Sequence, residues 1–172
     1  MIRKSGAPHA GALSFLRFAG VLLLMGLLVI SFFPGHDVVI VAVGDEIFAS
    51  IPLDEGEELV YCYTHSVEQS EVREYFHIVR GSLVLTRTAM KSFGAGLPTE
   101  EADGCYFQDG WYVLVMERPV PNLILRVSPF LEQKLMTDKT FVDLSGLETG
   151  LKVELRLTRR PAIWLHIKEV LS

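Results

Sequence analysis

The stretch LVYCYTHSVEQSEVREYFHIV, residues 59–79, contains two short runs in which apolar and polar side chains alternate. Side chains of a β-strand point to opposite faces with a period of two, so one face of each run is apolar. The runs cover residues 59–67 and 72–79, and only residues 68–71 separate them. The pattern predicts a β-hairpin that lies on a hydrophobic core.

Similar short runs continue along most of the chain, separated by turn residues at intervals of about 8 to 12 residues, which is typical of a sandwich or barrel. Further strands are predicted at residues 38–43, 47–51, 83–90, 104–107, 111–117, 123–127, 140–144, 151–158 and 163–170. Residues 129–136 are the one candidate for a short helix in this part of the chain. Residues 36–172 are therefore predicted to form an all-β sandwich or barrel domain.

The N-terminal segment has a different character. Residues 18–33 read FAGVLLLMGLLVISFF, and residues 18–35 carry no charge. At 1.5 Å per residue these 18 residues span about 27 Å, and with residues 13–16 they can cross a hydrocarbon core of about 30 Å. Residues 1–35 are predicted to be a cytoplasmic stub and a single transmembrane signal-anchor helix. A cleaved signal peptide is the alternative, although the sequence SFFP at the end of the run is a poor cleavage site.

The charges that flank this segment predict its orientation. Arg3, Lys4 and Arg17 precede the apolar run or lie at its start, whereas Asp37 and Asp45 follow it. Positive flanks stay on the cytoplasmic side. We expect a single-pass protein of the bacterial inner membrane with its C-terminal domain on the periplasmic or extracellular side.

The part expected outside the cytoplasm is acidic and contains both cysteines. It holds all 21 Asp and Glu residues and 13 of the 16 Lys and Arg residues, a net charge of −8. This charge argues against nucleic-acid binding, which requires a basic face. An oxidising compartment would permit a disulfide between Cys62 and Cys105, and two free thiols are the alternative.

Two polar residues interrupt the apolar face of the hairpin. Closing the hairpin through residues 68–71 pairs Tyr63 with Phe76 and places His65 opposite Glu74, with Cβ atoms about 5 Å apart. A pair of this kind is either a structural ion pair or a binding or acid–base site. Ser66 lies on the other face, which disfavours a Ser-His-Glu triad because nucleophile and base must touch.

The same register, continued over the turn at residues 80–81, places Arg87 opposite Glu74. Arg87 would then flank the carboxylate, or it is an exposed arginine on an edge strand. A second candidate is the segment Phe93-Gly94-Ala95-Gly96-Leu97-Pro98. Its glycines can turn successive N–H groups into an anion-binding nest, and an ordinary tight loop is the alternative.

Metal and cofactor binding have no support in the sequence. His65 and His77 fall on opposite faces of the predicted hairpin, and no C-x-x-C or H-x-x-x-H spacing occurs. We expect no metal and no cofactor.

The two candidate segments together resemble a known bacterial family. Tyr63-Thr64-His65-Ser66-Val67 followed by Glu74, and then the Phe93–Pro98 segment, look like the domain of unknown function numbered 1850 over residues 38–126. The resemblance marks the positions His65, Ser66, Glu74, Gly94, Gly96 and Pro98. Members are commonly encoded beside TAXI-type TRAP transporters, which import organic acids with an extracytoplasmic binding protein.

The resemblance implies an accessory role near such a transporter, but no particular activity. We expect a non-enzymatic, membrane-anchored accessory protein of a TRAP-type carboxylate uptake transporter. Its partners would be the permease or the solute-binding protein, and a small organic anion could bind in passing. One alternative is an extracytoplasmic enzyme that acts on the transported solute with a His65/Glu74 acid–base pair. Another is a purely structural assembly subunit.

Strand direction predicts that the two segments form one site. The strand over residues 83–90 runs back toward the turn at residues 68–71 and leads into the glycine segment. We expect the imidazole of His65 within about 10 Å of the backbone of Gly94 and Gly96, given about 3.3 Å per strand residue.

Overall fold

The computed structural model describes residues 10–32, 35–92, 102–128 and 131–160. Residues 10–32 form one helix, α1 (Ala10–Phe32), of 23 residues. In the helical residues whose side chains are described, no stretch is both long and apolar enough to span a membrane. The strands belong to a separate compact unit, His36–Arg160.

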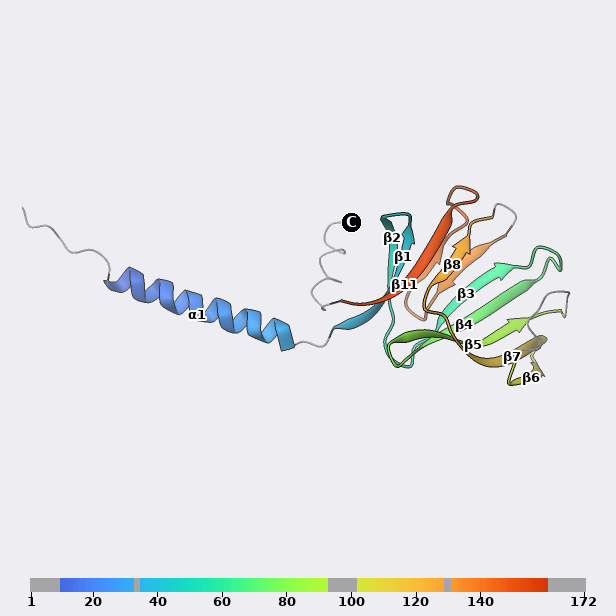
Figure 1. The fold of residues 1–172 in the computed structure, drawn as a ribbon, viewed down its shortest axis with the longest axis horizontal. Helices are drawn as coiled ribbons and strands as arrows, with labels where there is room; N and C mark the ends of the chain where they lie inside the picture. The colour runs from blue at the N-terminus through green and yellow to red at the C-terminus, as the bar shows by residue number, and fades with distance from the viewer. Residues whose placement is uncertain (1–9, 33–34, 93–101, 129–130, 161–172) are drawn as a thin grey trace, which may run out of the picture. The chain divides into compact units, whose positions relative to one another are not determined.

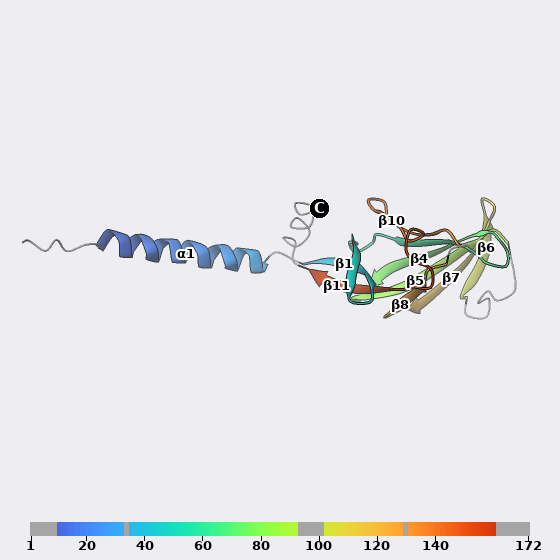
Figure 2. The same cartoon turned by 90° about the horizontal axis from the view of Figure 1, so that it is seen from above.

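The described residues of this unit form eleven strands in two antiparallel sheets, which Figures 1 and 2 show from two directions. The four-stranded sheet has the order β2 (Glu46–Pro52), β1 (His36–Val43), β11 (Lys152–Arg160) and β8 (Leu123–Arg126). The seven-stranded sheet has the order β10 (Phe141–Asp143), β9 (Gln133–Met136), β3 (Leu59–Thr64), β4 (Glu71–Val79), β5 (Ser82–Met90), β7 (Trp111–Pro119) and β6 (Gly104–Gln108).

Side chains from both sheets form one hydrophobic core. Val41 and Leu155 of the four-stranded sheet join the same buried cluster as Phe76, Leu85 and Leu114 of the seven-stranded sheet. Each of these residues is at most 1% exposed. Two sheets that share a core in this way make a β-sandwich, which decides between the two predicted architectures.

Two tight turns fix neighbouring strands of the larger sheet. Arg80-Gly81 joins β4 to β5, and Asp109-Gly110 joins β6 to β7. All four residues have positive φ, between 51° and 82°, as in the type I′ turns that suit the twist of a hairpin. The expected turn at residues 80–81 is confirmed, and it pairs Ile78 with Leu83 as predicted.

Three predicted elements need comment. The candidate short helix at residues 129–136 is wrong in its second half, because Gln133–Met136 form β9 beside β3. The strand predicted at residues 59–67 ends at Thr64. The strand predicted at residues 163–170 lies outside the described residues.

Candidate functional site

The face of the seven-stranded sheet that points away from the core, called the outer face here, carries most of the chemically active side chains. The strand register arranges them in rows that cross the sheet. The middle row runs Lys134, Cys62, Arg73, Ala89, Val113, Tyr106. One flanking row runs Met136, Val60, Tyr75, Arg87, Val115, Gly104. Small side chains on either side of Arg73 leave two hollows in the middle row.

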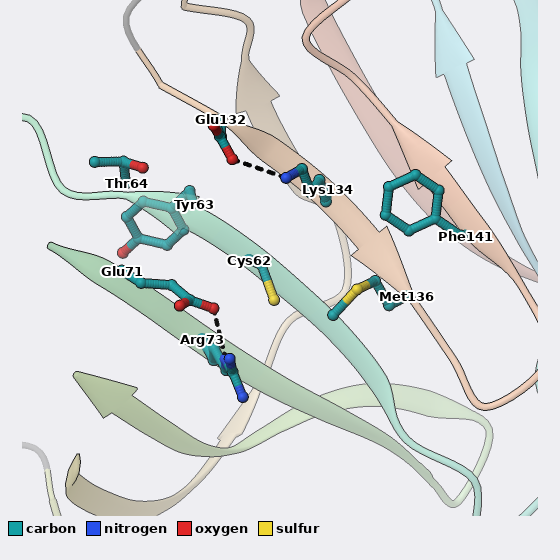
Figure 3. Close-up of a pocket in the computed structure, with 9 residues that line it drawn as sticks. All are labelled: Cys62, Tyr63, Thr64, Glu71, Arg73, Glu132, Lys134, Met136 and Phe141. Carbon is teal, nitrogen blue, oxygen red and sulfur yellow. Dashed lines mark hydrogen bonds and ion pairs between the residues drawn. The ribbon is translucent and has the colours of Figure 1, made fainter. Parts of the chain in front are cut away.

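The first hollow, called the Cys62 hollow, has a volume of about 350 Å³ and lies over β3, β4 and β9. Figure 3 shows the Cys62 thiol between Arg73 and Met136. Its charged groups are paired: Glu71 accepts from Nε of Arg73 at 2.7 Å, and Glu132 accepts from Nζ of Lys134 at 2.8 Å. Burial raises the pKa of the Cys62 thiol, and the neighbouring Arg73 offsets part of that rise. Burial therefore makes this thiol less reactive than an exposed cysteine.

The second hollow, called the Ala89 hollow, has a volume of about 250 Å³ and lies over β4, β5, β7 and β6. It is lined by Arg73, Tyr75, Arg87, Ala89, Tyr106, Gln108, Asp109, Trp111 and Val113. The guanidinium of Arg73 stacks over the ring of Trp111 at 4.5 Å, and that of Arg87 stacks over Tyr75 at 4.0 Å. Stacked guanidinium groups are held in fixed planes, which suits recognition of a carboxylate.

Glu58 organises the edge of the Ala89 hollow. Its carboxylate accepts from Nη2 of Arg87 at 2.7 Å and lies 3.2 Å from Nε2 of His77. The other ring nitrogen of His77 lies 3.1 Å from the hydroxyl of Thr86, which donates to the carbonyl of Tyr75. These contacts hold the His77 ring between Glu58 and Thr86.

His65 lies in the hairpin turn and not opposite Glu74, so the predicted pair is wrong. The turn spans residues 65–70: the N–H of His65 donates to the carbonyl of Ser70, and the N–H of Gln69 donates back to His65. Nδ1 of His65 accepts the N–H of Glu68 at 3.2 Å. These bonds end β3 three residues before its predicted end and shift the register by four residues. Because four is an even number, each residue stays on its predicted face.

Glu74 pairs with Tyr61 and faces the interior of the sandwich. Burial raises the pKa of Glu74, whereas the charge of Arg118 and a hydrogen bond with Tyr63 lower it. Burial also raises the pKa of Tyr63, and it raises that of Tyr61 to about 12. His65 lies four residues beyond Tyr61, the partner of Glu74. At strand spacing this is about 13 Å, which removes the geometry of an acid–base pair.

The predicted contact between Arg87 and Glu74 is also wrong. A bulge in β5 shifts the pairing between Tyr75 and Phe76, so Glu74 faces Thr88 and Arg87 faces Tyr75. One inserted residue moves every later side chain to the opposite face. Arg87 therefore belongs to the outer face, where Glu58 is its acidic partner.

The remaining predicted residues lie in or near the turn, or outside the described residues. Ser66 is exposed, and its carbonyl accepts from the Gln69 side chain at 2.5 Å. Gly94, Ala95, Gly96 and Pro98 lie outside the described residues, so the expected distance to His65 stays a prediction. The chain does return to this turn as far as Ser92, whose hydroxyl donates to Glu68 at 3.2 Å and lies 3.3 Å from that of Ser70.

The two cysteines are free thiols on opposite faces of the same sheet. Cys62 is buried on β3, and Cys105 is exposed on β6, four strands away. Strands lie about 4.8 Å apart, so the thiols are about 19 Å apart across the sheet, too far for a disulfide. In the part of the chain that the structure describes, no group of three His, Cys, Asp or Glu residues is placed to hold a metal ion.

The outer face was missed at the level of sequence, although the signal was present. The predicted pair consisted of polar residues on the apolar face. The residues of the outer face alternate with that face along β4: Glu71, Arg73, Tyr75 and His77. Alternation alone assigns them to the other side of the sheet. What it does not give is the set of neighbouring strands that place Ala89, Trp111 and Tyr106 beside them.

The fold and this face define a β-sandwich whose larger sheet presents a hollowed surface of arginines and aromatic rings. A family model described as domain of unknown function (DUF1850) matches residues 59–144, half of the chain. The chain belongs to this family. The matched range contains every strand of the seven-stranded sheet, together with β8. Searches of curated proteins and of solved structures each found no match.

Proposed function

We propose that this chain is a non-enzymatic, membrane-anchored accessory protein of a TRAP-type organic-acid uptake transporter, with the outer face as its functional surface. The observation that carries the proposal is the Ala89 hollow, in which two stacked arginines lie among three aromatic rings. This surface belongs to the part of the chain that the family shares. The partner comes from the resemblance to a family whose members are commonly encoded beside TAXI-type TRAP transporters.

The anchor rests on the N-terminal segment. The helix Ala10–Phe32 is about 35 Å long at 1.5 Å per residue, and Arg17 is its one charged residue. A helix that is apolar on all sides, without a polar stripe, is typical of a buried or membrane-spanning element. The positive N-terminal flank would keep residues 1–9 in the cytoplasm and direct the sandwich outward.

An enzymatic role has lost its main support. The acid–base pair expected of an enzyme required His65 to contact Glu74, and the register separates them. The buried carboxyl of Glu74, which lies beside two tyrosines, has a structural role. His65, which accepts a backbone N–H in the turn, has one as well. Binding of an anion or of an acidic protein surface fits the outer face better than catalysis does.

Co-purification tests the proposal. The tagged full chain, extracted in detergent from membranes that contain the transporter, should retain the TRAP-type permease or solute-binding protein, identified by mass spectrometry. Arg73→Glu on the outer face should reduce retention. The control Lys152→Glu, at an exposed position on β11 of the other sheet, should not. Absence of both transporter components, or turnover of the solute by the purified chain alone, would overturn the accessory role.

A further inference from the structure

The Ala89 hollow has the chemistry of a small-molecule site with two distinct halves. We propose that it binds a small monocarboxylate with a planar apolar body, such as an aromatic or conjugated acid. This inference rests on the proposed role in organic-acid uptake and names the class of solute that the outer face would meet. Three features carry it: the arginine donors, the apolar floor and the balance of charge.

The arginines supply preorganised donors. Stacking on Trp111 and Tyr75 uses the flat faces of the Arg73 and Arg87 guanidinium groups, and N–H donors point outward in the planes of these groups. Glu71 engages Nε of Arg73, and Glu58 engages Nη2 of Arg87. A guanidinium has five N–H donors, so these ion pairs orient the groups without using all their donors.

The floor and walls suit a flat apolar body. Ala89 and Val113, neighbours in the middle row, are 4% and 8% exposed and form an apolar floor. Tyr106 is 46% exposed and stands beside Val113 as one wall. Trp111 lines the hollow as well. A planar ligand placed on this floor would cover apolar surface and meet aromatic rings at its edges.

The charge balance selects a single negative charge. Arg73, Arg87 and the nearby Lys91, whose ammonium lies 5.1 Å from the centre of the Trp111 ring, are the cations. Three carboxylates oppose them: Glu71, Glu58 and the lining residue Asp109. The arginine donors can hold one carboxylate, but a second one would face this balanced site without a partner, which is costly.

Tryptophan fluorescence of the full chain in lipid nanodiscs provides the test. Trp164→Phe leaves Trp111 as the only tryptophan. Titration with sodium benzoate should give a saturable change, and neutral benzamide and dianionic succinate should bind at least about tenfold more weakly. Benzamide lacks the charge that strengthens hydrogen bonds from the arginines, and succinate brings a second carboxylate without a partner. Arg73→Gln and Arg87→Gln should each weaken benzoate binding by a similar factor.

Two further variants guard the result against misfolding and nonspecific binding. Ala89→Leu should block the hollow while a thermal melt verifies the fold, and Lys152→Gln, at an exposed position of the other sheet, should bind benzoate as the parent does. Benzoate that fails to saturate, or that binds no better than benzamide or succinate, overturns the monocarboxylate assignment. Transporter components that still co-purify would then leave the accessory role intact. Saturable benzoate binding without co-purification overturns the accessory role alone.

Discussion

Gln133 is the side chain that ties the two sheets together. It is 3% exposed, and its Nε2 donates to the hydroxyl of Tyr61 at 2.7 Å and to the carbonyl of Arg126 at 3.1 Å. Its Oε1 accepts the N–H of Ser128 at 2.9 Å. One buried amide thus joins β9 and β3 to the end of β8, across the core.

Gln133→Ala should lower the free energy of unfolding by about 3 kcal/mol, because removal of one partner leaves buried polar groups unsatisfied at about 1–3 kcal/mol each. Urea unfolding of the full chain, followed by circular dichroism, measures this loss. Lys134→Ala, the next residue on β9, points to the outer face and should change stability little. A Gln133→Ala variant as stable as Lys134→Ala would contradict the structural role.

Glu74 should make stability depend on pH. Its pKa is raised above the ordinary value of 4.5, chiefly by burial, so between the two pKa values the folded chain keeps a proton that the unfolded chain has released. Stability from this group is complete below pH 4.5 and falls as the pH rises through the folded pKa. Glu74→Gln should remove that fall and stabilise the chain at neutral pH.

Unfolding curves recorded from pH 4 to pH 8 would measure this effect. The exposed carboxylate of Glu132 provides the matched control, and Glu132→Gln should leave the pH dependence as it is. A Glu74→Gln variant that is less stable than the parent at neutral pH would mean that the charged carboxylate supports the fold.

At the scale of the element, the bulge in β5 decides which residues reach the outer face. Thr86 is the extra residue, because the pairing passes from Phe76↔Leu85 to Tyr75↔Arg87. Its hydroxyl donates to the carbonyl of Tyr75 at 3.2 Å, which bonds the bulge to the neighbouring strand. The bulge thereby places Arg87 on the same face as Ala89.

Thr86→Val keeps the branched shape but removes the donor, and it should cost about 1 kcal/mol of unfolding free energy. Thr86→Ser keeps the hydroxyl and should be closer to the parent. Equilibrium unfolding of both variants measures the difference. Equal losses in the two variants would assign the effect to packing of the methyl group and not to the hydrogen bond.

The placement of the cysteines on β3 and β6 predicts different reactivities. Cys62 is 6% exposed with a raised pKa, whereas Cys105 is exposed on the edge strand. In the native chain, iodoacetamide should modify Cys105 much faster than Cys62, since the thiolate is the nucleophile. Peptide mass mapping over time measures both rates, and the unfolded chain should show equal rates. A peptide in which both cysteines are linked would contradict the strand order.

At the scale of the whole molecule, the topology of the proposed anchor is open to a direct test. Alkaline phosphatase fused after Ser172 should be active, and green fluorescent protein at the same point should be dark, because the C-terminal domain is expected outside the cytoplasm. The reverse pattern would invert the orientation. Release of the mature chain into the soluble fraction would favour a cleaved signal.

The alternation of side chains in the sequence determined much of this protein. It predicts an all-β domain, the Arg80-Gly81 turn and the face on which each residue of β4 lies, because strand parity is a local property of the backbone. An even shift in register does not disturb it, so Glu74 faces the core as predicted while its partner changes.

The tertiary structure alone decided the partners. The turn at residues 65–70, the bulge at Thr86 and the insertion of β9 beside β3 depend on individual hydrogen bonds and on contacts between distant segments. Residues such as Ala89, Trp111 and Tyr106 become neighbours only once β4, β5, β7 and β6 have paired. The alternation along a strand determines the face on which a side chain lies. Its neighbours across the sheet depend on the pairing of distant segments, which no local pattern encodes.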